Sequence, residues 1–250
     1  MLRVLGNLLA CAACFCVPLR ADYSYQRSIK VTPGSRDPVV TTNLIKGNRM
    51  ALISKRHTTV IDIAAETITE IEFPKKTYSV IPFAQMKKLL EDAAAHTPLE
   101  TSFKVTSQRP GPTKPFGIVN AQETVISLAG ASGGENITVD SWIGTVPGYD
   151  QMIGFDRKLA DKMGFAFASG VAQLALNAPQ TLQAFGEAAK ELNKAPGAPL
   201  LTTIKIAGPD GILAVASIQL DNFGGGIQDA TRFDPPAGFK KVDAVLPHAP

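Results

Sequence analysis

The sequence has little cysteine, and what it has lies at one end of the chain. Its three cysteines, Cys11, Cys14 and Cys16, all fall within residues 1–21. If that segment is removed, the rest of the chain has no disulfide framework, no thiol nucleophile and no thiolate metal ligand. An apolar core must then hold the fold, and residues 22–250 are enough for one large domain.

Residues 1–21 have the pattern of a secretory signal peptide. Arg3 supplies a positive charge, residues 4–17 are almost wholly apolar, and a small-residue cleavage site ends at Ala21. The apolar run is too short to cross a membrane. We therefore expect cleavage near Ala21, export, and a single domain over residues 22–250. The alternative is a lipoprotein box that ends at Cys11, which would anchor the mature protein to a membrane through lipidated Cys11.

Excess charge and clustered metal ligands are also lacking. The formal net charge is +3 at pH 7, and it falls to about +1 once Arg3 and Arg20 leave with the signal peptide, which argues against a nucleic-acid partner. The three histidines, His57, His96 and His248, are scattered, and we place His57 in a basic turn. None has a second ligand at the spacing of a metal site, so the sequence predicts no metal.

The chain is organised around three strand-like segments followed by a helix. Residues 58–63, 67–73 and 77–81 are rich in Val, Ile, Thr and Tyr, and short polar or Pro-containing turns separate them. This pattern is typical of an antiparallel meander. After Pro82 the apolar residues recur at helical spacing from Phe83 onwards. We expect a curved meander whose concave face is covered by an amphipathic helix.

Strand and helix patterns alternate along the rest of the chain. Further strands are predicted over residues 23–31, 39–46, 49–54, 101–108, 120–129, 136–145, 200–207 and 212–222. We interpret the Pro/Gly-rich segment 109–115 as a loop and residues 224–226 as a flexible turn. About ten strands with helices inserted at two places predict an α+β fold.

Two long helices carry apolar stripes that are candidate ligand contacts. In the first of these helices, which contains Met152 and Phe155, we place Asp156 away from the apolar face. Together with the single tryptophan, the stripes make up the predicted apolar cleft: Trp142, Met152, Phe155, Leu159, Met163, Leu182 and Phe185. Such stripes usually belong to a packed core. Facing a sheet too open to close into a barrel, they could instead line a lipid-sized cleft.

The sequence contains little evidence for a catalytic site. Residues 130–134 match Gly-x-Ser-x-Gly around Ser132, but a nucleophile elbow needs a helix directly after the serine, and residues 135–139 are strand-like. The only downstream histidine is His248, so we interpret the segment as a hairpin loop and keep a serine hydrolase as a distant alternative. Asp62 and Glu66 are expected to be solvated charges at strand ends. We therefore predict that the protein is not an enzyme.

Several of these features together resemble a family of bacterial secreted proteins. They are the signal peptide, Asp62 in the meander, the segment Pro74-Lys75-Lys76-Thr77-Tyr78, the Trp142 strand before the helices, and the C-terminal Phe233-Asp234-Pro235-Pro236-Ala237-Gly238-Phe239. That family is similar to the LolA/LppX-type lipoprotein-carrier superfamily. The resemblance implies a half-open antiparallel β-barrel with helices over its concave face, a periplasmic location, no cofactor, and binding of lipid, acyl chains or lipoproteins.

Two hypotheses of different classes remain open. The first is a periplasmic protein that binds a lipid or lipoprotein in an apolar cleft. The second is a structural or interaction protein of the cell envelope whose half-barrel is filled by its own side chains. The nearly continuous apolar run over residues 165–176 favours the second hypothesis, because it would occupy the cleft.

Overall fold

A computed structural model of the chain describes residues 22–33, 37–95, 103–108, 110–130, 136–163 and 182–244. Its strands are β1 (Tyr23–Thr32), β2 (Val39–Lys46), β3 (Arg49–Ile53), β4 (His57–Asp62), β5 (Thr67–Glu72), β6 (Thr77–Pro82), β7 (Phe103–Gln108), β8 (Thr113–Phe116), β9 (Val119–Gly130), β10 (Asn136–Gly144), β11 (Ala198–Gly208), β12 (Gly211–Gly225) and β13 (Lys240–Lys241). The helices are α1 (Phe83–Ala95), α2 (Tyr149–Met163), α5 (Leu182–Leu192) and the short 3₁₀ turn η2 (Ala230–Phe233).

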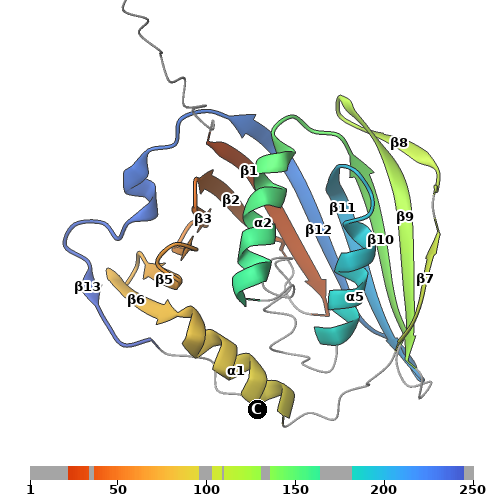
Figure 1. Cartoon of the computed structure of the whole chain (residues 1–250), viewed down its shortest axis with the longest axis horizontal. Helices are drawn as coiled ribbons and strands as arrows, with labels where there is room; N and C mark the ends of the chain where they lie inside the picture. Colours follow the sequence, from red (N-terminus) through yellow and green to blue (C-terminus); the bar gives the residue numbers. More distant parts are fainter. Residues whose placement is uncertain are drawn as a thin grey trace, which may run out of the picture.

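All 13 strands belong to one unclosed sheet. Its order is β13-β6-β5-β4-β3-β2-β1-β12-β11-β10-β9-β7, with β8 paired to β9. Every pairing in the described residues is antiparallel apart from β13 with β6. In Figure 1 the sheet curves around α2 and α5. The prediction of an open antiparallel sheet combined with helices is therefore confirmed, in a structure that is mostly β.

The sheet has 13 strands where about ten were expected; eleven segments were predicted as strands, and two strands, β8 and β13, escaped the sequence pattern. β8 begins inside the segment 109–115, which was predicted as a loop, and contains Pro115. A proline is tolerated there because β8 pairs with β9 alone. β13 is only Lys240 and Lys241, which pair with Thr77 and Tyr78 of β6. Two residues are too few to show a period. The predicted turn at 224–226 was also wrong, because Gly224 and Gly225 pair with β1.

The predicted meander and its helix are confirmed as β4, β5, β6 and α1. Asp62 shapes the first turn of the meander. Its Oδ1 accepts hydrogen bonds from the backbone N–H groups of Ala64 and Ala65, at 3.0 and 2.9 Å, and Glu66 takes the left-handed conformation with φ 53°. Arg49 Nε lies 3.4 Å from Asp62 Oδ2. Asp62 is thus a turn-forming residue with an ionic partner, rather than the plain solvated charge that we expected.

Two helices cover one face of the sheet, which we call the inner face. The buried side of α2 packs with Tyr25, Ile45, Met50 and Ile61 on the β1–β6 half. Ala184 and Ala188 of α5 pack with a second cluster on the β9–β12 half, made of Ile126, Leu128, Ile137, Val139, Ile204 and Ala216. The opposite, outer face of β2–β6 is covered by the C-terminal segment, whose Phe233 and Phe239 pack against Leu44, Ala51, Val60 and Ile71.

Several predictions fall on residues outside the described part of the chain. They are the signal peptide over residues 1–21, the Ser132 loop over residues 131–134, and the apolar run over residues 165–176. None of the described helices is long and apolar enough to span a membrane.

Candidate ligand-binding site

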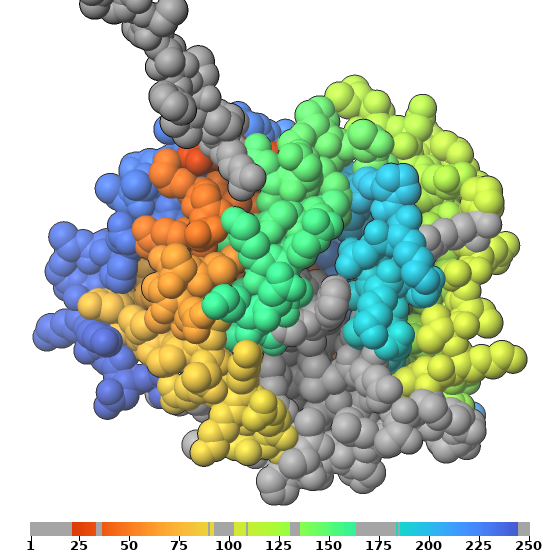
Figure 2. All heavy atoms as spheres, in the orientation of Figure 1, coloured from red at the N-terminus to blue at the C-terminus, as the bar shows by residue number. Residues whose placement is uncertain are grey.

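A strip of sheet between the two helices is the best candidate for a binding surface. β1 and β12 pass behind the interval between α2 and α5 in Figure 1, and Figure 2 shows a narrow hollow between these helices. On the inner face, neighbouring residues of the two strands form the pairs Arg27–Leu220, Ile29–Ile218 and Val31–Ala216. We call these six residues the β1/β12 strip. At about 3.4 Å per residue, the strip is roughly 14 Å long from Arg27 to Val31.

The strip joins two apolar clusters that are otherwise separate. Leu220 belongs to the cluster under α2, and Ala216 belongs to the cluster under α5. Ile218 lies between them, is only partly buried, and packs against both clusters. Because Ile29 and Val31 are also partly buried, the middle of the inner face keeps apolar area that neither helix fully covers. Such area is a suitable surface for an apolar chain.

The α2 end of the strip carries polar donors without partners. Arg27 Nε is buried and makes no hydrogen bond within the part of the chain that the structure describes. Asn43 of β2 lies opposite Tyr25, diagonally next to Arg27, and is 0% exposed. Its Nδ2 is also without a partner, while its Oδ1 accepts a long hydrogen bond of 3.4 Å from Thr41 Oγ1. A buried donor with no acceptor destabilises a fold by about 1–3 kcal/mol, so two on one patch call for an explanation.

Asp156 of α2 faces this patch. Burial raises the pKa of the Asp156 carboxyl to about 7, and the positive charge of Arg27 opposes the increase. Burial together with the Asp156 charge also raises the pKa of Tyr25 and of Tyr149 far above the usual tyrosine value. The site therefore contains one cation, one carboxyl that titrates near neutral pH, and two neutral phenols.

Tyr23 closes the end of β1 beneath the start of α2. Its ring lies 6.3 Å from the Tyr25 ring, and its hydroxyl is buried without a partner among the described residues. Burial, reinforced by Asp150, raises the pKa of Tyr23 to about 12. The ring packs against Gly148, where an added Cβ would come within 2.8 Å of it. Gly148 also has φ +75°, so both the turn and the close approach require glycine.

The predicted α2 stripe is buried in the cluster under that helix. Met152, Phe155, Leu159 and Met163 are 2–6% exposed and pack with the inner face of β1–β6. They support α2 above the polar patch. Contact between these four residues and a ligand stays a prediction. The same holds for Leu182 and Phe185, whose backbone starts α5 but whose side chains lie outside the described part.

Trp142 lies apart from the α2 stripe. Its ring is 6.0 Å from the Phe116 ring, and Lys114 Nζ lies 4.8 Å from the Trp142 ring centroid. These contacts tie β10 to the β8–β9 hairpin, and Trp142 packs with the cluster of Ala121, Val146, Ala198 and Leu200. The structure therefore places Trp142 beside β8 and not beside Phe155.

His57 is the first residue of β4 and not part of a basic turn, so that prediction was wrong. Its Nε2 contacts the Glu70 carboxylate, and Thr59 Oγ1 donates to the same Glu70 oxygen at 2.8 Å. The hydrogen bond to Glu70 raises the pKa of His57, while partial burial opposes the shift. The described residues contain no group of three or more side chains that could hold a metal ion.

Sequence reasoning missed Arg27, Asn43 and Asp156. The sequence did contain signals for Arg27 and Asp156. Arg27 follows Tyr23 and Tyr25 at intervals of two, which places a charge on the buried side of β1. Asp156 lies four residues after Met152 and three before Leu159, so it belongs near the apolar face of α2 and not away from it.

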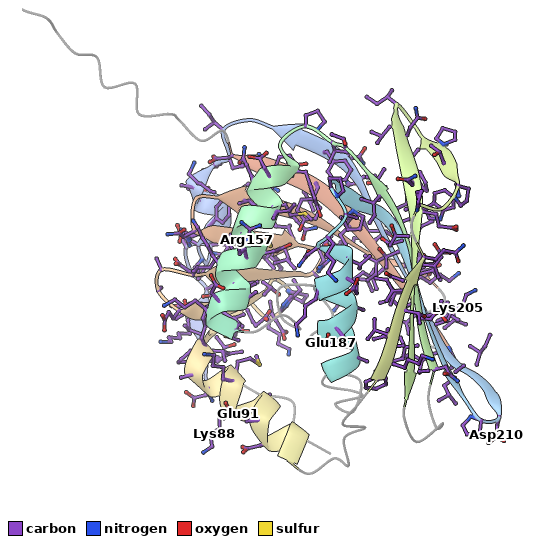
Figure 3. The ribbon with its side chains drawn as sticks, turned by 45° about the vertical axis from the view of Figure 1, so that its right-hand side comes forward. Lys88, Glu91, Arg157, Glu187, Lys205 and Asp210 are labelled. Atoms are coloured by element: carbon purple, nitrogen blue, oxygen red, sulfur yellow. The ribbon has the colours of Figure 1, made fainter. Side chains whose placement is uncertain are left out.

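The charged residues on the outer sides of the helices offer no comparable site. Arg157 of α2 and Lys88 and Glu91 of α1 are exposed and point away from the sheet (Figure 3). Asp210 lies at the tip of the β11–β12 hairpin, which projects beyond the other strands (Figure 3).

No protein-family model matches the chain, and no curated protein matches it in sequence. Among solved structures, the chain is similar to the crystal structure of a LolA superfamily protein from Nitrosomonas europaea. The match covers 86% of this chain and 90% of that chain, with 7% sequence identity and a TM-score of 0.30. Because both values are low, the function of this chain has to be inferred from its own residues.

Proposed function

We propose that this protein is a non-enzymatic, exported binding protein that holds the acyl chain of a lipid or lipoprotein against the β1/β12 strip. The observation that carries the proposal is the partly buried apolar strip between α2 and α5, of which Ile218 is the centre. Burying an apolar chain on this strip removes apolar area from water, at about 25 cal/mol per Å². The open sheet supplies a curved support without closing over the strip.

One observation favours the alternative of a self-filled structural protein. The α2 stripe is packed as tightly as an ordinary core, with Phe155 only 2% exposed. If the strip is covered in the same way in solution, there is no room for a ligand. The two functions are distinguished by whether the purified protein contains or takes up an apolar chain.

The test is a titration of the delipidated protein with a fluorescent fatty acid, on wild type and two matched pairs of variants. Ile218→Trp should block the strip by volume, and Ile218→Gln should make it polar, so both should weaken binding at least tenfold while the protein stays folded by circular dichroism. Ile212→Trp and Ile212→Gln are the controls, because Ile212 lies in the same strand, outside the strip, and is 68% exposed. These controls should bind like wild type.

Mass spectrometry of an organic extract from natively purified protein provides a second readout. We expect a co-purifying lipid, and its amount should fall in Ile218→Trp. Absence of probe uptake by wild type, or equal uptake by the Ile218 and Ile212 variants, would reject the binding function in favour of the self-filled alternative.

A further inference from the structure

We propose that Arg27 and Asn43 bind the anionic head group of the ligand, a carboxylate or a phosphate, whose apolar chain lies along the β1/β12 strip. This inference rests on the proposed function and names the chemical class of its ligand. The two side chains provide an anchor at one end of the strip, so they also fix the direction of the bound chain.

The first argument is the pair of unpaired donors. Arg27 Nε and Asn43 Nδ2 are buried, carry hydrogen that no described residue accepts, and come from adjacent strands. Arg27 is opposite Thr41 on β2, and Asn43 is two residues further, so the two side chains are diagonal neighbours on the inner face. The guanidinium N–H and the amide N–H₂ are both donors, and the amide oxygen of Asn43 accepts from Thr41 rather than from Arg27, so a partner shared by the two donors would be an acceptor. An oxyanion is the strongest acceptor for a guanidinium.

The second argument is the pattern along the strip. Arg27 is the only charged residue of the strip, and it lies at the α2 end. The inner-face residues beyond it on β1, Ile29 and Val31, are apolar, and so are their partners Ile218 and Ala216 on β12. A strip roughly 14 Å long that is polar at one end and apolar along the rest matches an amphiphile with one charged end.

The third argument is electrostatic. The titratable groups that interact with Arg27 are Asp156 from α2 and, charged at very high pH only, Tyr25 of β1, while Thr41 and Asn43 of β2 are neutral. Arg27 and Asp156 interact through space, but no ion pair between them lies within 4 Å in the described residues. When Asp156 is protonated, the Arg27 charge has no counter-ion among the residues that the structure describes. A bound anion would then supply one, so we expect anion affinity to rise as pH falls from 8 to 6.

The experiment compares three probes with the same twelve-carbon chain: laurate, dodecyl phosphate and dodecanol. Calorimetric titrations at pH 7.5 and constant ionic strength measure each Kd on the delipidated protein. We expect wild type to bind at least one of the two anions ten or more times more tightly than dodecanol. The anion with the larger increase in affinity over dodecanol identifies the head group as carboxylate or phosphate.

Variants then assign the preference to the two residues. Arg27→Gln should reduce the anion preference to about twofold or less with dodecanol affinity unchanged, and Arg27→Lys should keep part of the preference. Asn43→Leu separates a binding role from a structural role through the Tm of the ligand-free protein, which would fall if Asn43 were a structural residue. The substitution removes an unpaired buried donor, so it should leave the ligand-free Tm unchanged or higher while weakening anion binding.

Two different failures can be told apart. If dodecanol binds as tightly as the anions in wild type, or if Arg27→Gln keeps the preference, the head-group assignment is wrong and the binding function stands. If none of the three probes binds, both the binding function and the assignment are wrong. If Asn43→Leu lowers the ligand-free Tm and leaves the Kd values unchanged, Asn43 is a structural residue and has no part in the site.

Discussion

The substitution Asp156→Asn should change how the stability of the protein depends on pH. Burial raises the pKa of Asp156 from 3.8 to about 7 in the folded protein. Between these two values the folded state holds a proton that the unfolded state has released, so stability falls as pH rises. Each pKa unit corresponds to about 1.4 kcal/mol, and the full shift therefore amounts to roughly 4 kcal/mol lost between about pH 4 and pH 7. Asparagine has the same shape and cannot ionise, so the variant should not show this loss.

Urea unfolding of the ligand-free wild type and variant at a series of pH values from 4 to 8.5 measures the effect. The free energy of unfolding of Asp156→Asn, minus that of wild type, should rise by about 1.4 kcal/mol per pH unit between about pH 4 and pH 7 and then level off. Asp161→Asn is the control, because Asp161 is exposed on the same helix, and its difference from wild type should stay flat. A flat difference for Asp156→Asn as well would contradict a raised pKa of the Asp156 carboxyl in the folded protein.

Three further predictions concern the surroundings of the site. Glu70→Gln should lower the pKa of His57 in an NMR titration, because the Glu70 hydrogen bond raises that pKa. The stability that this pair contributes is present below the pKa of histidine in the unfolded chain, and it is lost as pH rises through the pKa of His57 in the folded protein. An unchanged His57 titration in the variant would exclude the contact. Gly148→Ala should lower the free energy of unfolding by more than about 1 kcal/mol, because its φ is +75° and its Cβ would meet a tyrosine ring at 2.8 Å. Gly154 lies inside α2 with no atom within 4 Å of an added Cβ, so Gly154→Ala should raise the free energy of unfolding by about 0.5–1 kcal/mol. Equal effects at the two glycines would contradict the contact between Gly148 and the tyrosine ring. Phe155→Ala should lower the free energy of unfolding by about 3–5 kcal/mol in urea unfolding. A variant that is folded and equally stable but no longer takes up a fatty acid would instead place Phe155 in a ligand cavity.

The strands were predictable where β-branched residues alternate and clear turns separate them. The meander β4–β6 and the hairpins β9–β10 and β11–β12 are of this kind, because each buries one face and pairs with its neighbour in sequence. β13 was not predictable, because its two residues pair with a strand far earlier in the chain. β8 was hidden by Pro115, which is compatible with pairing on one side only.

The candidate site was less predictable than the fold, because its parts meet only through long-range packing. Pairing of β1 with β12 brings the first and last long strands of the chain together, and no local pattern indicates that pairing. We assigned Asp156 to a polar face because a carboxyl is normally solvated, although its spacing from Met152 and Leu159 places it near the apolar face of α2. Burial of α2 against the inner face of the sheet overrides that preference and leaves Asp156 with a raised pKa near Arg27.

The central claim is that an apolar chain lies on the inner face between α2 and α5, with its polar end at Arg27. Photo-crosslinking with a fatty acid that carries a diazirine near its methyl end, followed by peptide mass spectrometry, tests this claim most directly. We expect label on the strip around Val31 and Ala216 and on the adjoining part of α5, competed by unlabelled laurate and lost in Ile218→Trp. Label confined to the exposed apolar residues Ile118, Ile212 and Leu213, unchanged by Ile218→Trp, would contradict the account.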